Sequence, residues 1–275
     1  MSYLTSLLSD LPLYLLSLPV LLMAFSVHET AHGYVAYKLG DPTARSLGRL
    51  TLNPIKHIDP IGFICMMVFH VGWAKPVPIN TRYFKNPKRD MALTGAAGPL
   101  SNLAMAIIHL VLLRIVMLFL TDACYDEVVT FMLSSSQTVF KGSLTFTIYA
   151  LIVYLLYLGI VMNISLAIFN LIPIPPFDGS RIFYAVLPQK LYWGVMKYER
   201  IIMVVMMVLF FFGFLDTPLD WIFNKVTSGL FFASGMYAGE AFTIPGLPVD
   251  FDFGKTYGVF EAMLIYIEQL LSLAL

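Results

Sequence analysis

The sequence predicts an all-α integral membrane protein. We expect a polytopic helical bundle with a short extended or re-entrant segment between the first two long spans. Hydrophobic residues make up 59% of the 275 positions, charged residues only 12%, and the mean hydropathy is +0.79. A soluble domain needs about a quarter charged residues to cover its surface. Long apolar runs also recur along the chain, so most of its surface is expected to face lipid.

The first apolar run extends without a break from Leu11 to Val27. As a helix it would be about 25 Å long, close to the hydrocarbon thickness of a membrane. The apolar pattern continues to Leu39, and Gly40-Asp41-Pro42 ends it. No basic residue precedes the run and no small-residue cleavage site follows it, so we expect the segment to be retained as a span.

Further apolar segments follow along the chain. Residues 60–74 are apolar but short for a span, which favours a re-entrant or interfacial segment. Long apolar runs lie at 92–120, 144–169 and 201–215, and weaker ones at 219–238 and 256–275. We expect one membrane domain over residues 1–238. Residues 239–275 would form a tail that is either an amphipathic or a transmembrane helix.

Basic residues predict the orientation in the membrane. Thirteen of the seventeen Lys and Arg residues lie within 38–89 and 171–200. Loops rich in Lys and Arg stay on the cytoplasmic side, so both connections are expected there and the N-terminus outside. The formal net charge is zero, which gives no argument for nucleic acid as a partner. Cys65 and Cys124 are far apart in sequence, so neither a disulfide framework nor a cysteine metal site is expected.

The sequence His28-Glu29-Thr30-Ala31-His32 matches the pattern H-E-x-x-H. Residues four apart on a helix share one face, so His28 and His32 can bind one Zn²⁺ ion. Glu29 can then take a proton from a water molecule that the zinc activates. The alternative is two interior histidines and a buried glutamate that share a helix by chance. Ionisable groups are costly inside a membrane, which favours a functional site.

A catalytic zinc site needs a third protein ligand, and we expect Asp178 to supply it. Pro173, Pro175 and Pro176 break the third long run just before Asp178-Gly179. The predicted topology places Asp178 at the same membrane depth as the histidine pair. The alternative for Asp178 is a residue of a helix-terminal turn. Asn170 has two equal interpretations, a donor to a developing oxyanion or a cap on the broken helix.

These motifs together resemble the site-2 protease family of intramembrane zinc metalloproteases, over roughly residues 10–235. The matching elements, in family order, are His28-Glu29-Thr30-Ala31-His32, Gly98-Pro99-Leu100-Ser101-Asn102 and Asn170…Pro173…Pro176…Asp178-Gly179. Three further stretches resemble the compact branch without PDZ or CBS domains: Gly48 to Pro54, His57 to Pro60 and Gly72 to Pro78. Ser180 departs from the family, since many relatives have a second glycine there.

The resemblance implies hydrolysis of peptide bonds inside transmembrane substrates. His28, His32 and Asp178 would bind Zn²⁺, and Glu29 would activate water. Asn170 would be a further catalytic residue, and Asn102 would lie near the substrate. Partners would be single-span membrane protein substrates and the lipid bilayer, and the sequence leaves the oligomeric state open. We expect a multi-pass protein, in the cell membrane, with its site near the cytoplasmic face. The alternatives are a catalytically silent membrane scaffold and a metal transporter on the same framework.

Overall fold

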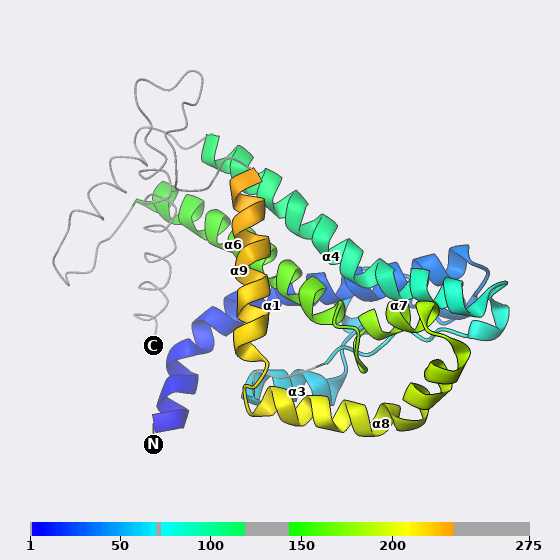
Figure 1. Ribbon diagram of the computed structural model, residues 1–275. Coiled ribbons are helices and arrows are strands. Elements are labelled where there is room, and N and C mark those ends of the chain that lie inside the picture. The colour runs from blue at the N-terminus through cyan, green and yellow to red at the C-terminus, as the bar shows by residue number, and fades with distance from the viewer. Residues whose placement is uncertain (1, 70–72, 119–142, 234–275) are drawn as a thin grey trace. The chain divides into compact units, whose positions relative to one another are not determined.

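The computed structural model describes residues 2–69, 73–118 and 143–233, and these are largely helical (Figure 1). No strand occurs within these ranges, where one antiparallel bridge joins Ile58 to Ala74. The predicted all-α class is therefore confirmed. The helices, in order, are α1 (Ser2–Lys38), α2 (Thr43–Ser46), η1 (Pro54–Lys56), α3 (Pro60–Phe69), η2 (Thr81–Tyr83), α4 (Pro87–Leu118), α6 (Leu144–Asn170), α7 (Gly179–Val186), α8 (Gln189–Phe211) and α9 (Asp216–Ala233).

Among the described residues, three helices are long and apolar enough to cross a membrane. The qualifying segments are Leu15–Lys38, Pro87–Met117 and Leu144–Asn170, which agree with the first three long runs of the sequence. Most of the run at 201–215 lies in the second half of α8, which also carries Lys197, Glu199 and Arg200 and is not among these three helices. Residues 119–142, which carry Asp122, Asp126 and Glu127, and the predicted tail 239–275 lie outside the described residues.

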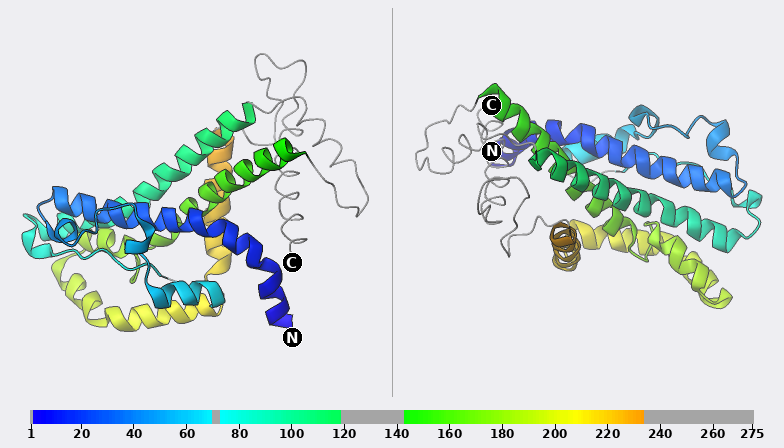
Figure 2. Two further views of the ribbon diagram at one scale, coloured as in Figure 1. Left: turned by 180° about the vertical axis from the view of Figure 1, so that it is seen from behind. Right: turned by 90° about the horizontal axis from the view of Figure 1, so that it is seen from above.

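The segment between the first two spans contains both helix and extended chain. Most of the apolar stretch 60–74 forms α3, a ten-residue helix that is too short to span a membrane. From Trp73 to Asn80 the chain is extended and runs beside the second half of α1 (Figure 2). The short helix α3 is compatible with the re-entrant or interfacial segment predicted for residues 60–74, and the extended chain follows it.

The chain divides into two compact units. One comprises residues 1–20, 107–161 and 226–275, and its interior includes the ring of His109 packed against Gly159. The other comprises residues 21–106 and 162–225. All residues predicted to carry chemistry belong to this second unit, so its internal packing is what positions the site.

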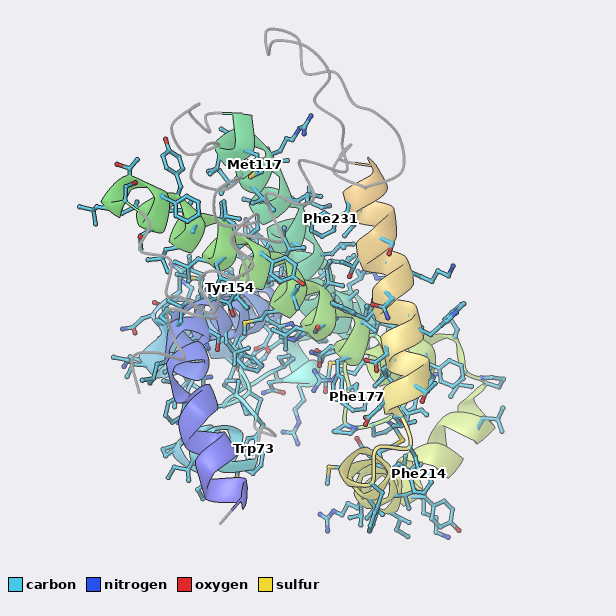
Figure 3. The ribbon with its side chains drawn as sticks, turned by 90° about the vertical axis from the view of Figure 1, so that its left-hand side faces the viewer. Trp73, Met117, Tyr154, Phe177, Phe214 and Phe231 are labelled. Atoms are coloured by element: carbon cyan, nitrogen blue, oxygen red, sulfur yellow. The ribbon has the colours of Figure 1, made fainter. Side chains whose placement is uncertain are left out.

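The turn after α6 brings Asp178 back toward the bundle. Leu171 to Phe177 leave the helix, and the Pro175–Pro176 peptide bond is cis. Gly179 folds against the backbone that has just ended α6: a Cβ there would lie 2.3 Å from the Leu171 carbonyl oxygen. Phe177 anchors the turn, since its ring meets that of Phe169 edge to face with centroids 4.9 Å apart (Figure 3). Only glycine fits after Asp178, which explains the Asp-Gly pair.

Candidate metal centre

Three ligand atoms from two distant parts of the chain converge in the second unit. His28 and His32 lie one turn apart on α1, and their Nε2 atoms are 3.0 Å apart. Oδ2 of Asp178 lies 3.1 Å from Nε2 of His28 and 3.0 Å from Nε2 of His32. Among the described residues these three side chains form the one cluster with the composition of a metal site. The structure therefore brings together the three ligands that the sequence predicted.

The outer nitrogen of each histidine is held by a fixed acceptor. Nδ1 of His32 donates to the Thr94 carbonyl oxygen at 2.7 Å, an atom that can only accept. Nδ1 of His28 lies 2.5 Å from Oδ1 of Asn102. The amide of Asn102 is oriented by its own Nδ2, which donates to the Ala24 carbonyl oxygen at 3.3 Å. Both rings therefore carry their proton on Nδ1, and the neutral ring presents the lone pair of Nε2 to the centre.

This arrangement suits a shared cation. Two Nε2 lone pairs and a carboxylate oxygen face one another at about 3 Å, and all three are acceptors. An ionised carboxylate is the form that binds a metal. Without a shared cation the three groups would repel one another in a poorly solvated setting.

The chemistry and spacing of the ligand atoms fit zinc. Two imidazole nitrogens and one carboxylate oxygen are a donor set that catalytic zinc uses, with one position left open. Zinc–ligand distances of about 2.0–2.1 Å in a tetrahedron give ligand separations of roughly 3.3 Å. The observed separations of 3.0–3.1 Å are close to that value. The fit rests on these three side chains and on the space beside them.

Gly98 of α4 provides that space. A Cβ at this position would lie 2.4 Å from Nε2 of His32 and 2.6 Å from Nε2 of His28. Any larger residue would occupy the volume in which the ligand atoms meet. The glycine of the Gly98-Pro99-Leu100-Ser101-Asn102 motif thus has a specific physical role: it leaves room at the centre on the side of α4.

Asp178 occupies the residue before α7, where an aspartate usually caps the helix. Its side chain makes no capping hydrogen bond. The carboxylate is directed at the histidines instead, and 13% of the side chain is exposed. A cap would stabilise α7 by about 1 kcal/mol. Asp178 makes contacts with the two histidines in place of that capping bond, so the alternative of a simple turn residue does not account for its contacts.

Glu29 lies beside the ligands but does not join them. Its Oε2 accepts a hydrogen bond from the backbone N–H of Val77 at 2.8 Å. The side chain is partly exposed, unlike those of its neighbours His28 and His32. Glu29 directly follows His28, so it lies beside the face of α1 that carries the two histidines. A base that acts on a metal-activated water is expected in this place.

The two asparagines have different roles in the structure. The resemblance implied a place near substrate for Asn102, whereas its side chain is fully buried and holds His28. Asn170 donates through Nδ2 to the Leu166 carbonyl oxygen of its own helix at 2.9 Å. That contact matches the helix-end interpretation of Asn170, and it uses one of the two N–H groups of the amide.

Sequence reasoning missed three groups that support the centre. Thr94 contributes a carbonyl oxygen, Val77 contributes an amide, and Asn163 accepts from Nδ2 of Asn102 at 2.8 Å. The first two act through the backbone, so no side chain identifies them. Asn163 could have been noticed as a single amide inside a long apolar run.

Comparisons with known proteins agree with this chemistry. Residues 17–215, well over half of the chain, match the model of peptidase family M50. The chain is 39% identical over 190 residues to "Putative zinc metalloprotease YwhC" of Bacillus subtilis (strain 168), covering 69% of this chain and 77% of that protein. It is 27% identical over 178 residues to "Putative zinc metalloprotease Rip2" of Mycolicibacterium smegmatis, covering 62% and 57%. A protein of the same printed name from Mycobacterium tuberculosis is 23% identical over 211 residues, covering 74% and 69%. No solved structure matches.

The space beside Gly98 leads to a first prediction. Gly98→Ala should lose bound zinc, with at least a tenfold weaker affinity, because the new methyl group clashes with both Nε2 atoms. The measurement is zinc per purified chain by mass spectrometry, with chelator competition for affinity. Gly229→Ala in α9 is the matched control, since a Cβ there meets nothing within 4 Å. Normal zinc content in Gly98→Ala would contradict the assignment of this space.

The contact with His28 leads to a second prediction. Asn102→Ala should weaken zinc binding roughly 10–100-fold, the usual effect of losing a group that orients a metal-bound histidine. Chelator competition measures it. Ser101→Ala is the control, because that hydroxyl donates to the Gly98 carbonyl oxygen of its own helix. Equal zinc affinity in the two variants would show that Asn102 does not orient His28.

Proposed function

The chain belongs to peptidase family M50, and we propose that it is a zinc-dependent endopeptidase that cuts peptide bonds within the transmembrane segments of other membrane proteins. The convergence of His28, His32 and Asp178 carries this proposal. The two histidines lie on a helix that is long and apolar enough to cross a membrane. A hydrolytic centre built at that depth has embedded peptide as its accessible substrate.

The residues divide the chemistry among themselves. His28, His32 and Asp178 would hold the zinc, which when bound lowers the pKa of water to about 7 and polarises a carbonyl. Glu29 would take the proton from the attacking water on Oε1, since Oε2 already accepts from Val77. It would then pass the proton to the nitrogen of the leaving peptide. Asn102 would keep His28 oriented throughout.

The membrane position follows from helix geometry. Lys38 ends α1, while Lys88 and Arg89 lie in the first turn of α4. Basic residues at these ends favour the cytoplasmic face. His32 and His28 precede Lys38 by six and ten residues, so they lie about 9 Å and 15 Å along the helix from that end. We therefore place hydrolysis within the membrane but near its cytoplasmic surface.

Substrates are proposed to be single-span membrane proteins. A peptide bond within a helix is shielded by its hydrogen bonds and its side chains, so the segment must unwind locally before attack. Helix-breaking residues in the substrate near the cleaved bond should make this unwinding easier. A catalytically silent scaffold would bind such proteins without chelator-sensitive cleavage. A metal transporter would instead show metal flux into liposomes.

The role of Glu29 leads to a third prediction. Glu29→Gln should retain its fold and zinc content but lose cleavage by about 10²–10⁴-fold, because the amide cannot take a proton. Cleavage of a reconstituted single-span substrate measures it, with zinc per chain as the control. Wild-type rates in Glu29→Gln would remove this side chain from the mechanism.

The proposed orientation leads to a fourth prediction. In a chain with Cys65→Ser and Cys124→Ser, a cysteine placed at Lys85 should react with a membrane-impermeant maleimide only after the cytoplasmic side is opened. A cysteine at Leu144, the exposed start of α6, should react in intact cells. The opposite pattern would place the metal centre near the outer face.

A further inference from the structure

A short extended segment contacts the catalytic base directly. We define it as the strap, Ala74–Asn80, and it runs beside α1 (Figure 2). The backbone N–H of Val77 donates to Oε2 of Glu29 at 2.8 Å. A hydrogen bond from a neutral N–H to an ionised carboxylate is stronger than one between two neutral groups. The strap therefore fixes one oxygen of the group that is proposed to move the proton.

The sequence of the strap directs this single donor at Glu29. Pro76 and Pro78 flank Val77 and have no N–H, so Val77 supplies the one backbone donor of the three residues. Lys75 and Val77 each precede a proline, which favours extended backbone at both positions. Little conformational freedom remains to be lost when the strap is seated. A Pro-Val-Pro sequence thus presents one amide in a stiff, extended setting.

The strap is anchored on both sides of Val77. Nη2 of Arg49 donates to the Lys75 carbonyl oxygen at 2.7 Å, and Arg49 is only 8% exposed. The Asn80 N–H donates to Oδ2 of Asp41 at 2.6 Å, and Asp41 is fully buried. Two buried charged side chains used on backbone groups are an expensive way to hold a loop, which indicates that its position matters.

The side chain of Val77 sets its distance from α1. Val77 is 6% exposed, and a Cβ at Gly33 would lie 3.0 Å from its Cγ1. Gly33 follows Glu29 by four residues, so the two share a face of the helix. The missing side chain at Gly33 lets the strap approach α1 closely enough for the amide to reach the carboxylate.

We propose that the strap is a positioning element for catalysis. The last torsion of a glutamate side chain is broad, so a carboxylate without a fixed donor swings between orientations. With Oε2 held by Val77, the free oxygen Oε1 is kept at one place beside the zinc ligands. Arg49 and Asp41 are then positioning residues that act through the strap. This inference rests on the proposed function, since it assigns the strap's role in that reaction.

The test removes one backbone N–H and changes no side chain. Replacing Val77 by its α-hydroxy acid puts an ester oxygen in place of the N–H. We expect kcat to fall about 10–100-fold, with KM within twofold and zinc per chain unchanged. The same replacement at Ile79 is the matched control, since the structure gives that N–H no partner among the described residues. It should leave kcat within twofold of wild type.

A second variant keeps the inference testable if the ester chain does not accumulate. Arg49→Gln removes the charged donor to the Lys75 carbonyl, and it should also lower kcat at constant zinc content. Arg49→Lys should recover part of the rate. Hydrogen exchange gives a readout that needs no cleavage: the strap peptide should exchange at least tenfold faster in Glu29→Ala than in wild type, because Val77 loses its acceptor.

The outcomes separate the two proposals. An active wild type with unchanged kcat in both the Val77 ester and Arg49→Gln would overturn the role of the strap alone. Loss of zinc in the ester variant would also overturn it, because the strap would then support the metal ligands and not the base. A wild type that binds zinc and cleaves no membrane substrate would overturn the proposed function and the strap's catalytic role with it.

Discussion

The convergence of three acceptors on one point is the constraint on which the second unit depends. Two neutral imidazoles and a carboxylate, from positions 150 residues apart, present lone pairs to one another at about 3 Å. In a poorly solvated setting this arrangement is unfavourable until a cation is shared. The fold must therefore force the ligands together before the metal can stabilise them. Helix spacing does this for the histidines, and the broken end of α6 does it for Asp178.

Three polar atoms beside the ligand atoms have partners, and these partners come from two other elements, α4 and the strap. Nδ1 of His28 is matched by a side chain of α4, Nδ1 of His32 by a backbone carbonyl of α4, and Glu29 by the strap. Unmatched polar groups cost several kcal/mol in a medium without water. The same hydrogen bonds that remove this cost also fix the tautomers and orientations that metal binding requires. Stability and function therefore use one set of contacts.

The sequence predicted the ligands well because their chemistry is local. Helix periodicity places His28 and His32 on one face. The prolines before Asp178 are visible in the sequence and predict the end of a helix there. The supporting groups were harder to predict. Asn102 was placed near substrate, but burial directs it to His28, and long-range packing of α4 on α1 decides this. The amide of Val77 could not be predicted at all, because any residue except proline carries one. Residues 60–74 were expected to be re-entrant or interfacial, and the ten-residue helix α3 within them is short enough for either, since apolar composition alone does not distinguish the two.

Small residues and helix breaks, usually seen as weaknesses, are what make the centre possible. Glycine within a helix costs about 1 kcal/mol relative to alanine, yet Gly98 leaves the volume where the ligands meet. The prolines after α6 end its hydrogen bonding, yet a continued helix would carry residue 178 away, about 12 Å beyond Asn170. A metal bound to all three ligands would offset the local stability given up at these positions. A metal centre of this kind is thus coupled to folding: the sequence choices that favour binding are the ones that disfavour the empty fold.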